Sequence, residues 1–337
     1  MKQKITSVIA AVLILSTLLC SCNSGTTEDT TINENTQTVQ SYETISSETI
    51  YPYTFTDSLG YEVTLEEKPE NIAVMFSSFA DIWKTAGGEV SVTVGEAVER
   101  GFADSGVTLI DEGSGHSTID NETLINAEPD IVIGTTDYEC QVSTAELCRN
   151  AGIPSASFKV ESFDDYLRVL KIFCDLTGET ERYEKYGVEV GEEIKNILAD
   201  AEQKKTDSPK ILFIRAGSSA KSTKAKNTDE NFACRMLSEL GCTNIADTDT
   251  TLSAELSLEA IIEENPEYMF ITTMGSEEAA KDYMNSLLES EGWRELDCVK
   301  SGKYYFLPKD LFHFKPNSRW AEAYDYIADI LYPTSES

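Results

Sequence analysis

Short apolar runs alternate with helical stretches along most of this chain, and this alternation limits the fold more than any other feature. Residues 71–76 have the composition of a buried strand, and residues 77–88 that of a helix closed by two glycines. A strand follows at 130–134, and a second series opens with a strand at 210–215. Strands that alternate with helices predict a parallel sheet covered by helices. The expected fold class is therefore α/β.

A long helical region separates the two series. Between residues 162 and 205 apolar residues recur at spacings of three and four. Its second part, at about 1.5 Å per residue, is long enough to connect two lobes. We therefore predict two Rossmann-like lobes joined by a long connector helix, with a ligand cleft between the lobes. The predicted divisions are 51–161 for the N-terminal lobe, 162–207 for the helical connector and 208–333 for the C-terminal lobe.

The first 50 residues predict a targeting signal and a tether. Lys2 and Lys4 precede a short apolar core, and the following Leu-Cys-Ser-Cys, which ends at Cys22, resembles a bacterial lipobox. Residues 1–21 are then a signal peptide with Cys22 as the acylated residue, carrying palmitate or similar chains, and an ordinary secretory signal is the alternative. Residues 22–50, rich in Ser, Thr, Asn and Glu, predict a disordered tether. The expected location is extracytoplasmic, lipid-anchored to the cell membrane.

Composition excludes some partners. The chain has 27 basic and 59 acidic residues, a formal net charge of −32, which disfavours binding to nucleic acid or to an anionic lipid surface. Six cysteines follow the lipobox without any C-x-x-C pair, so we expect buried reduced thiols rather than a zinc site. Cysteines eight positions apart on one helix would lie about 12 Å from each other, too far for a disulfide.

One sequence pattern occurs twice in the chain. Residues 121–134 and 256–272 each contain a helix, a proline and a strand, and in each a glutamate stands seven positions before the proline. A helix–proline–strand corner explains the apolar residues and the proline. Glu122 and Glu259 both fall in the first helical turn, where the helix dipole favours an acidic residue. The dipole alone could account for both glutamates, so their role stays open at this point.

The whole pattern resembles the substrate-binding proteins of ATP-driven importers for iron–siderophore complexes, haem and cobalamin. The resemblance covers about residues 53–333 and rests on the opening hairpin, the repeated corner, the long connector and the closing helix. The hairpin positions that match the family pattern are Asp57, Gly60, Val63 and Pro69. The resemblance implies a monomer that works with an ABC permease dimer and its ATPase. It also implies that Glu122 and Glu259 are docking residues, since one surface glutamate in each lobe of these proteins enters a cationic socket on the permease.

The ligand-binding residues should come from loops that follow the strand ends, because open α/β sheets bind ligands there. The predicted ligand-binding residues are Phe79, His116, Thr135, Tyr138, Arg215, Ser253, Met274, Phe312, His313 and Lys315. Basic residues gather in two stretches of this acidic chain, 208–228 and 298–319, which favours an anionic ligand. The two histidines, His116 and His313, could ligate the iron of a bound complex.

These patterns predict a receptor that captures a ferric siderophore or similar anionic chelate, with no tightly bound cofactor. Haem or a corrinoid is the alternative ligand, and the positions matched to aromatic residues of corrinoid binders carry His116, Thr135 and Ser253. A bare zinc or manganese ion would need three or four ligands. The sequence has no G-x-S-x-G, H-E-x-x-H or Walker lysine motif, so an enzyme is not expected. A surface-anchored enzyme and an adhesin-like lipoprotein are the remaining alternatives.

Overall fold

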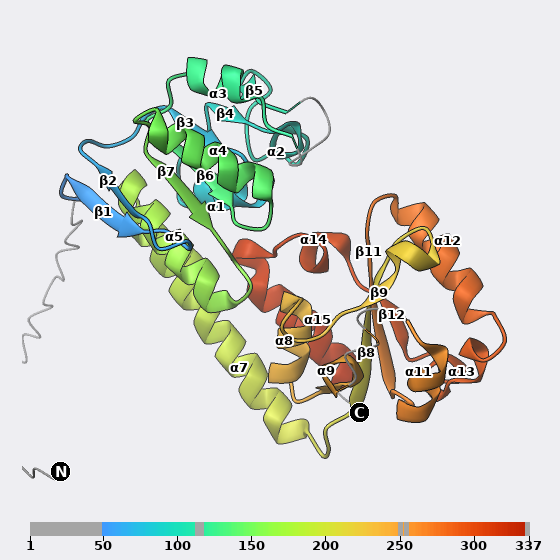
Figure 1. Cartoon of the computed structure of the whole chain (residues 1–337). Helices are drawn as coiled ribbons and strands as arrows, with labels where there is room; N and C mark the ends of the chain where they lie inside the picture. Colours follow the sequence, from blue (N-terminus) through green and yellow to red (C-terminus); the bar gives the residue numbers. More distant parts are fainter. Residues whose placement is uncertain (1–48, 112–117, 249–251, 253–255, 334–337) are drawn as a thin grey trace, which may run out of the picture. The chain divides into compact units, whose positions relative to one another are not determined.

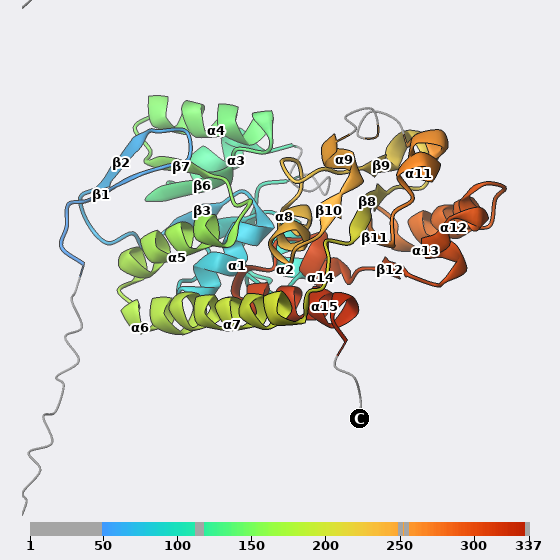
Figure 2. The same cartoon turned by 90° about the horizontal axis from the view of Figure 1, so that it is seen from below.

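The computed structural model describes residues 49–111, 118–248, 252 and 256–333, all within one compact unit, Ser46–Ser337. These ranges form a two-stranded hairpin, two five-stranded sheets and the helices around them (Figures 1 and 2). The predicted fold class is confirmed: two α/β lobes are joined by a helical connector. The exact residue limits of the lobes stay a prediction. Among the described helices, none is long and apolar enough to cross a membrane.

Asp57 occupies the turn of the hairpin and holds it in place. Strands β1 (Tyr53–Thr56) and β2 (Glu62–Leu65) pair antiparallel, as predicted. The Asp57 side chain is buried, and its Oδ1 accepts hydrogen bonds from the backbone N–H groups of Leu59 and Tyr61, each at 2.9 Å. Its Oδ2 accepts from the N–H of Ser157 at 3.0 Å. One carboxylate therefore closes the turn and attaches the hairpin to the first sheet.

We expect Asp57→Ala to lower the free energy of unfolding by about 3–5 kcal/mol, because three backbone donors lose a charged acceptor in a buried setting. Urea unfolding followed by circular dichroism measures this change. The exposed Asp104 provides the control, since Asp104→Ala should change stability by less than about 0.5 kcal/mol. Equal stabilities of the two variants would contradict this role of Asp57.

The first sheet has the strand order β5-β4-β3-β6-β7, and every neighbouring pair is parallel. Its strands are β3 (Ile72–Val74), β4 (Val92–Thr93), β5 (Thr108–Leu109), β6 (Ile131–Thr135) and β7 (Ser155–Phe158). Its helices are α1 (Ser77–Thr85), α2 (Gly95–Glu99), α3 (Asn121–Asn126) and α4 (Glu139–Asn150). Strand β3 is buried along its whole length, as expected of a central strand covered on both faces.

The second sheet has the order β10-β8-β11-β12, with β9 paired to β8. Its strands are β8 (Lys210–Ala216), β9 (Lys224–Ala225), β10 (Thr243–Asn244), β11 (Tyr268–Thr273) and β12 (Tyr304–Phe306). Its helices are α8 (Phe232–Glu239), α9 (Ile245–Thr248), α11 (Leu258–Glu264), α12 (Glu277–Leu288), α13 (Asp297–Lys300), α14 (Lys309–Phe312) and α15 (Trp320–Leu331). Strand β9 is antiparallel, a departure from the predicted parallel sheet. Two residues are too short a run to leave a periodic signal in the sequence.

The connector consists of α5 (Phe163–Thr177), α6 (Thr180–Tyr183), a π-helical turn (Glu184–Val188) and α7 (Glu189–Lys204). Ser162 caps α5 in a capping box with Asp165, and Gly178 ends it with a φ of 83°. Gly187, in the π-helical turn before α7, lets this turn lie close to α5. A Cβ on Gly187 would lie 2.9 Å from Leu167 Cδ2, closer than packed carbon atoms approach. Figure 1 shows α7 continuing from this contact toward the second sheet.

One hydrophobic core extends through both lobes. The larger cluster of buried side chains includes both faces of the first sheet, the inner faces of α5 and α7, and Ile211 and Phe213 of β8. The intervening β8 residues, Leu212 and Ile214, belong to a second cluster on the opposite face of that strand. Neighbouring side chains of a strand point to opposite faces, so β8 contributes to both clusters.

The six cysteines of the described ranges are free, and all except the half-buried Cys140 are buried. Burial raises the pKa of Cys174 and of Cys242 to about 12. These two side chains are therefore protonated thiols at neutral pH, with the low reactivity typical of structural cysteines.

Candidate functional site

A cavity of about 920 Å³ lies where the carboxyl ends of both parallel sheets meet. Phe76 follows β3, Tyr138 follows β6, Arg215 stands near the end of β8 and Met274 follows β11. The remaining wall includes the segment after α14 with His313. Both lobes thus contribute to one site at their strand ends, the position expected for a ligand in open α/β sheets.

The structure brings together six of the ten predicted ligand-binding residues. Those that line the cavity are Tyr138, Arg215, Met274, Phe312, His313 and Lys315. His116 and Ser253 lie outside the described residues. Phe79 and Thr135 are not among the described residues that line the cavity, and their role in ligand binding stays a prediction.

Phe79 and Thr135 are both buried. Phe79 is 2% exposed and its ring contacts those of Phe76 and Phe158 at centroid distances of 5.7 and 5.9 Å. Thr135 is 1% exposed, and its Oγ1 accepts a hydrogen bond from the backbone N–H of Asp137 at 3.1 Å. The physical reason is local: α1 begins at Ser77, so its first turn directs Phe79 into the core while Phe76 remains in the wall.

Arg215 is the cationic group of the cavity with the clearest lack of a partner. Its Nε is buried and has no hydrogen-bond partner among the described residues. Lys315, in contrast, pairs with Glu161 across the cavity wall at 3.0 Å. A buried N–H donor without an acceptor is costly, and a ligand oxygen in the cavity would satisfy it. Arg215 is therefore the described side chain of the wall best suited to bind a negatively charged or strongly accepting ligand group.

The predicted basic stretch 208–228 is divided by the structure. Lys210 pairs with Glu264 at 2.8 Å, at the amino end of β8 and away from the cavity. Lys226 pairs with Glu230 at 3.3 Å. Lys221 and Lys224 line a separate cavity of about 450 Å³ in the second lobe. Only Arg215 of this stretch reaches the main cavity, so the stretch as a whole is not a binding surface.

Sequence reasoning missed the acidic residues of the cavity. The described wall carries five carboxylates, namely Glu96, Asp137, Glu161, Asp229 and Glu230. The position of Asp137, next to Tyr138 after β6, was a usable signal, because it follows a strand end in the same way as the predicted residues. The cavity is therefore of mixed charge rather than uniformly cationic.

His313 is half-buried in the wall, and its ring contacts that of Phe314 at 4.9 Å. Burial lowers the pKa of His313 below its usual 6.5, Lys309 lowers it further, and Glu96 opposes both. The imidazole is thus neutral at pH 7 and can offer a lone pair to a ligand. The described residues include no group of three or more His, Cys, Asp or Glu side chains that could hold a metal ion by themselves.

The lowered pKa of His313 predicts a pH-dependent stability. The unfolded chain binds this proton more readily than the folded chain, so folding opposes protonation of His313. We expect the free energy of unfolding of the wild type, minus that of His313→Gln, to decrease as the pH falls through about 6.5. Urea unfolding of both proteins at several pH values between 8 and 5 measures it. A constant difference would contradict the prediction.

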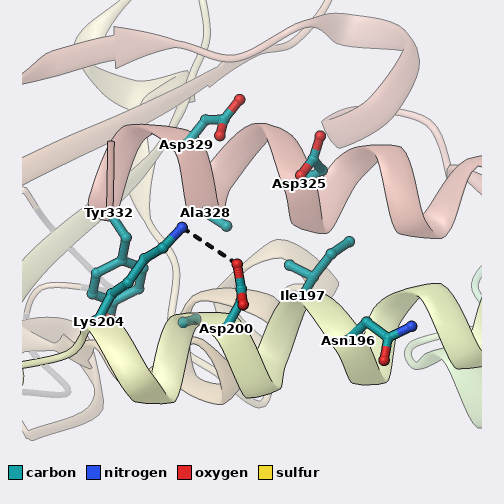
Figure 3. Close-up of a pocket in the computed structure, with 9 residues that line it drawn as sticks. Asn196, Ile197, Asp200, Lys204, Asp325, Ala328, Asp329 and Tyr332 are labelled. Atoms are coloured by element: carbon teal, nitrogen blue, oxygen red, sulfur yellow. Dashed lines mark ion pairs between the residues drawn. The ribbon is translucent and has the colours of Figure 1, made fainter. Parts of the chain in front are cut away.

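Another cavity, of about 330 Å³, lies between α7 and α15 (Figure 3). Its charged side chains are Asp200 and Lys204 from α7 and Asp325 and Asp329 from α15. Lys204 and Asp200 form an ion pair at 3.4 Å, shown as the dashed line. This groove lies between two helices and away from the strand ends, so we assign the ligand site to the larger cavity.

The two predicted docking glutamates occupy matching corners. Glu122 and Glu259 are exposed in the first turns of α3 and α11, capped by Asp120 and Ser257. Each helix directly precedes a parallel strand of its own sheet, α3 before β6 and α11 before β11. The residue before each proline, Glu128 or Asn265, has a positive φ of 48° or 45°. The repeated phrase is therefore the same helix-ending corner in both lobes.

These features define a class: a two-lobed binding protein with a helical connector and a ligand cavity between the lobes. The sequence model of the periplasmic binding proteins matches residues 72–311. The chain belongs to this family.

Individual relatives agree with this assignment. The chain is 22% identical over 338 residues to YvrC of Bacillus subtilis (strain 168), an uncharacterized ABC transporter substrate-binding lipoprotein, covering 98% of both chains. Its fold is similar to that of the periplasmic heme-binding protein RhuT from Roseiflexus sp. RS-1 in its apo form. That match has a TM-score of 0.62 and 19% identity and covers 78% of this chain and 98% of RhuT. Staphylococcus aureus SirA, complexed with staphyloferrin B, matches with a TM-score of 0.64 and 14% identity, over 83% of this chain and 98% of SirA.

Proposed function

We propose that this protein is the substrate-binding component of an ABC importer, and that it captures an iron complex in the cavity between its lobes. The position of Arg215 is the observation that carries the proposal: its guanidinium lines the cavity, and its buried Nε has no hydrogen-bond partner among the described residues, so a bound acceptor group would satisfy it. Ferric siderophores present carboxylate or similar oxygen atoms. These oxygens accept charge-assisted hydrogen bonds from the N–H groups of an arginine. The staphyloferrin B complex of SirA supports this ligand class.

Haem is the second candidate, and a specific observation favours it. The cavity combines His313, Tyr138 and Met274, whose side chains are of types that ligate haem iron, with the rings of Phe76 and Phe314. A neutral imidazole suits such a role. The similarity to the heme-binding protein RhuT supports the same reading. His116 remains an alternative iron ligand to His313. A corrinoid remains an alternative to an iron complex as the bound ligand.

The partners and location follow from the same role. The protein works as a monomer outside the cytoplasm, acylated at Cys22 after removal of residues 1–21 and tethered to the membrane by residues 22–50. The name of YvrC, a lipoprotein, supports the anchor. The protein delivers its ligand to a permease dimer with an ATPase and has no catalytic activity of its own. Glu122 and Glu259 dock into cationic sockets of the two permease subunits, since surface carboxylates in both lobes suit a reversible charge-steered contact.

A thermal-shift panel tests the proposed function. A ligand present at 100 times its Kd stabilises the folded state by about 2.7 kcal/mol, which raises Tm by roughly 5 °C in a protein of this size. We expect such a shift with ferric staphyloferrin B or with haemin, and none with cobalamin or the iron-free siderophore. Absence of a shift with every iron complex, together with turnover of some substrate, would overturn the receptor assignment.

A further inference from the structure

The segment that follows α14 belongs to the second half of the chain but is attached to the first lobe. Asn317 is fully buried, and its Nδ2 donates hydrogen bonds to the carbonyl oxygen of Ser78 at 3.0 Å and to Oδ2 of Asp81 at 2.8 Å. Both acceptors belong to α1. Asn317 has a φ of 52°, a left-handed conformation that asparagine tolerates better than most residues. The backbone conformation of Asn317 and its two side-chain hydrogen bonds therefore both hold this turn against α1.

Two further contacts hold the same segment. The guanidinium of Arg100, at the end of α2, lies 3.8 Å from the ring centroid of Phe314 and donates a hydrogen bond to Ser77 Oγ at 3.1 Å. Lys315 pairs with Glu161, which follows β7, and both side chains are at most 20% exposed. Three anchors, at Phe314, Lys315 and Asn317, thus join this segment to the end of α2, the loop after β7 and α1. The mostly buried ion pair with Glu161 also restricts the position of the Lys315 ammonium group.

We infer that Asn317 and Asp81 are positioning residues for the ligand cavity, which hold the cavity-lining segment 313–315 on the first lobe. This inference rests on the proposed function. In the described part of the chain neither residue lines the cavity, whereas His313, Phe314 and Lys315 all do. Part of the wall built from the C-terminal half therefore keeps a fixed place relative to Phe76 and Tyr138. Arg215 and Met274, on β8 and after β11, are among the wall residues that belong to the second lobe.

The test compares Asn317→Gly with a matched variant. Glycine removes the amide without straining the positive φ, so the anchor is lost while the backbone conformation stays accessible. Asn244→Ala is the control: Asn244 is also a buried asparagine, donates to the Lys226 carbonyl oxygen at 2.8 Å and accepts from the Ala246 N–H at 3.1 Å, all within the second lobe. A second pair is Asp81→Ala and Asp81→Asn, since the asparagine oxygen can still accept from Asn317.

Two readouts are measured on the full mature domain: amide hydrogen exchange of residues 309–319, and affinity for haemin and for ferric staphyloferrin B, each added alone. We expect Asn317→Gly and Asp81→Ala to accelerate exchange in this segment about tenfold or more. We also expect them to weaken binding, about tenfold, of the complex that the wild type binds. Asn244→Ala should change neither by more than about twofold, and Asp81→Asn should restore most of both values.

Unchanged exchange in residues 309–319 would overturn the anchor, and faster exchange with unchanged affinity would overturn the positioning role. An equal loss of affinity in Asn244→Ala would reduce the effect to general destabilisation and would also overturn the inference. If the wild type binds neither complex, the proposed ligand class fails. The exchange comparison between Asn317→Gly and Asn244→Ala then decides by itself whether Asn317 holds the segment.

Discussion

Arg215→Ala should lower the affinity for the iron complex about 100-fold, equivalent to about 3 kcal/mol, while leaving the fold intact. Arg215 lines the cavity and its buried Nε has no hydrogen-bond partner in the described part of the chain, so a bound acceptor gains a charge-assisted hydrogen bond. Binding is measured by fluorescence titration with the complex that shifts Tm. Arg215→Gln, which keeps a neutral donor, should lose less affinity than Arg215→Ala.

Lys221→Ala is the control for this prediction. Lys221 belongs to the same basic stretch but is exposed and lines the separate cavity of the second lobe. Its removal subtracts the same charge from the protein and should change affinity by less than about twofold, because salt screens exposed charges at a distance. If the two variants lose affinity equally, the effect comes from net charge and not from a contact of Arg215 with the ligand.

Charge reversal of both docking glutamates, Glu122→Lys with Glu259→Lys, should abolish uptake of the iron complex by intact cells. A lysine at each corner would face the cationic socket of a permease subunit, and like charges at an interface cost several kcal/mol. Ligand affinity should stay within about twofold of the wild type, because neither glutamate is among the residues that line the cavity in the described chain. Uptake of the radiolabelled iron complex and titration of the purified protein provide the two measurements.

The matched control carries two reversals on the helical connector, Glu181→Lys with Glu193→Lys. Both glutamates are exposed, and their substitution by lysine changes the net charge by the same amount as the Glu122 and Glu259 substitutions. This control should retain most of the uptake. Uptake that is equally low in both double variants would point to a non-specific charge effect. A loss of ligand affinity in the Glu122 and Glu259 variant would instead mean that these residues act on the cavity, which contradicts a docking role.

The architecture could be predicted because each of its elements has a local cause. Alternating strand and helix patterns specify parallel sheets, and the left-handed residue before Pro129 and Pro266 gives both corners the same shape. The hairpin could be predicted from its alternating residues and its Ser-Leu-Gly turn. Strand β9 could not, because it depends on an edge offered by β8 rather than on its own two residues.

The site could be predicted only in part, because proximity to a strand end does not fix where a side chain points. Tyr138 and Arg215, predicted from their positions at strand ends, line the cavity. Phe79 does not line it, because the first turn of α1 directs its ring into the core. The anchor formed by Asn317 and Asp81 joins residues more than 200 positions apart in the sequence, and a single sequence carries no signal for such a pair.

The shared hydrophobic core has a consequence for how the chain is made. Trp320, in the first turn of the last helix, packs between Phe163 and Phe232, with centroid distances of 6.2 and 5.7 Å. The side chain that joins α5 to α8 in the interior is thus among the last of the described residues to leave the ribosome. This part of the core therefore closes only when translation is nearly finished, whereas the strands and helices of the first sheet are made long before it.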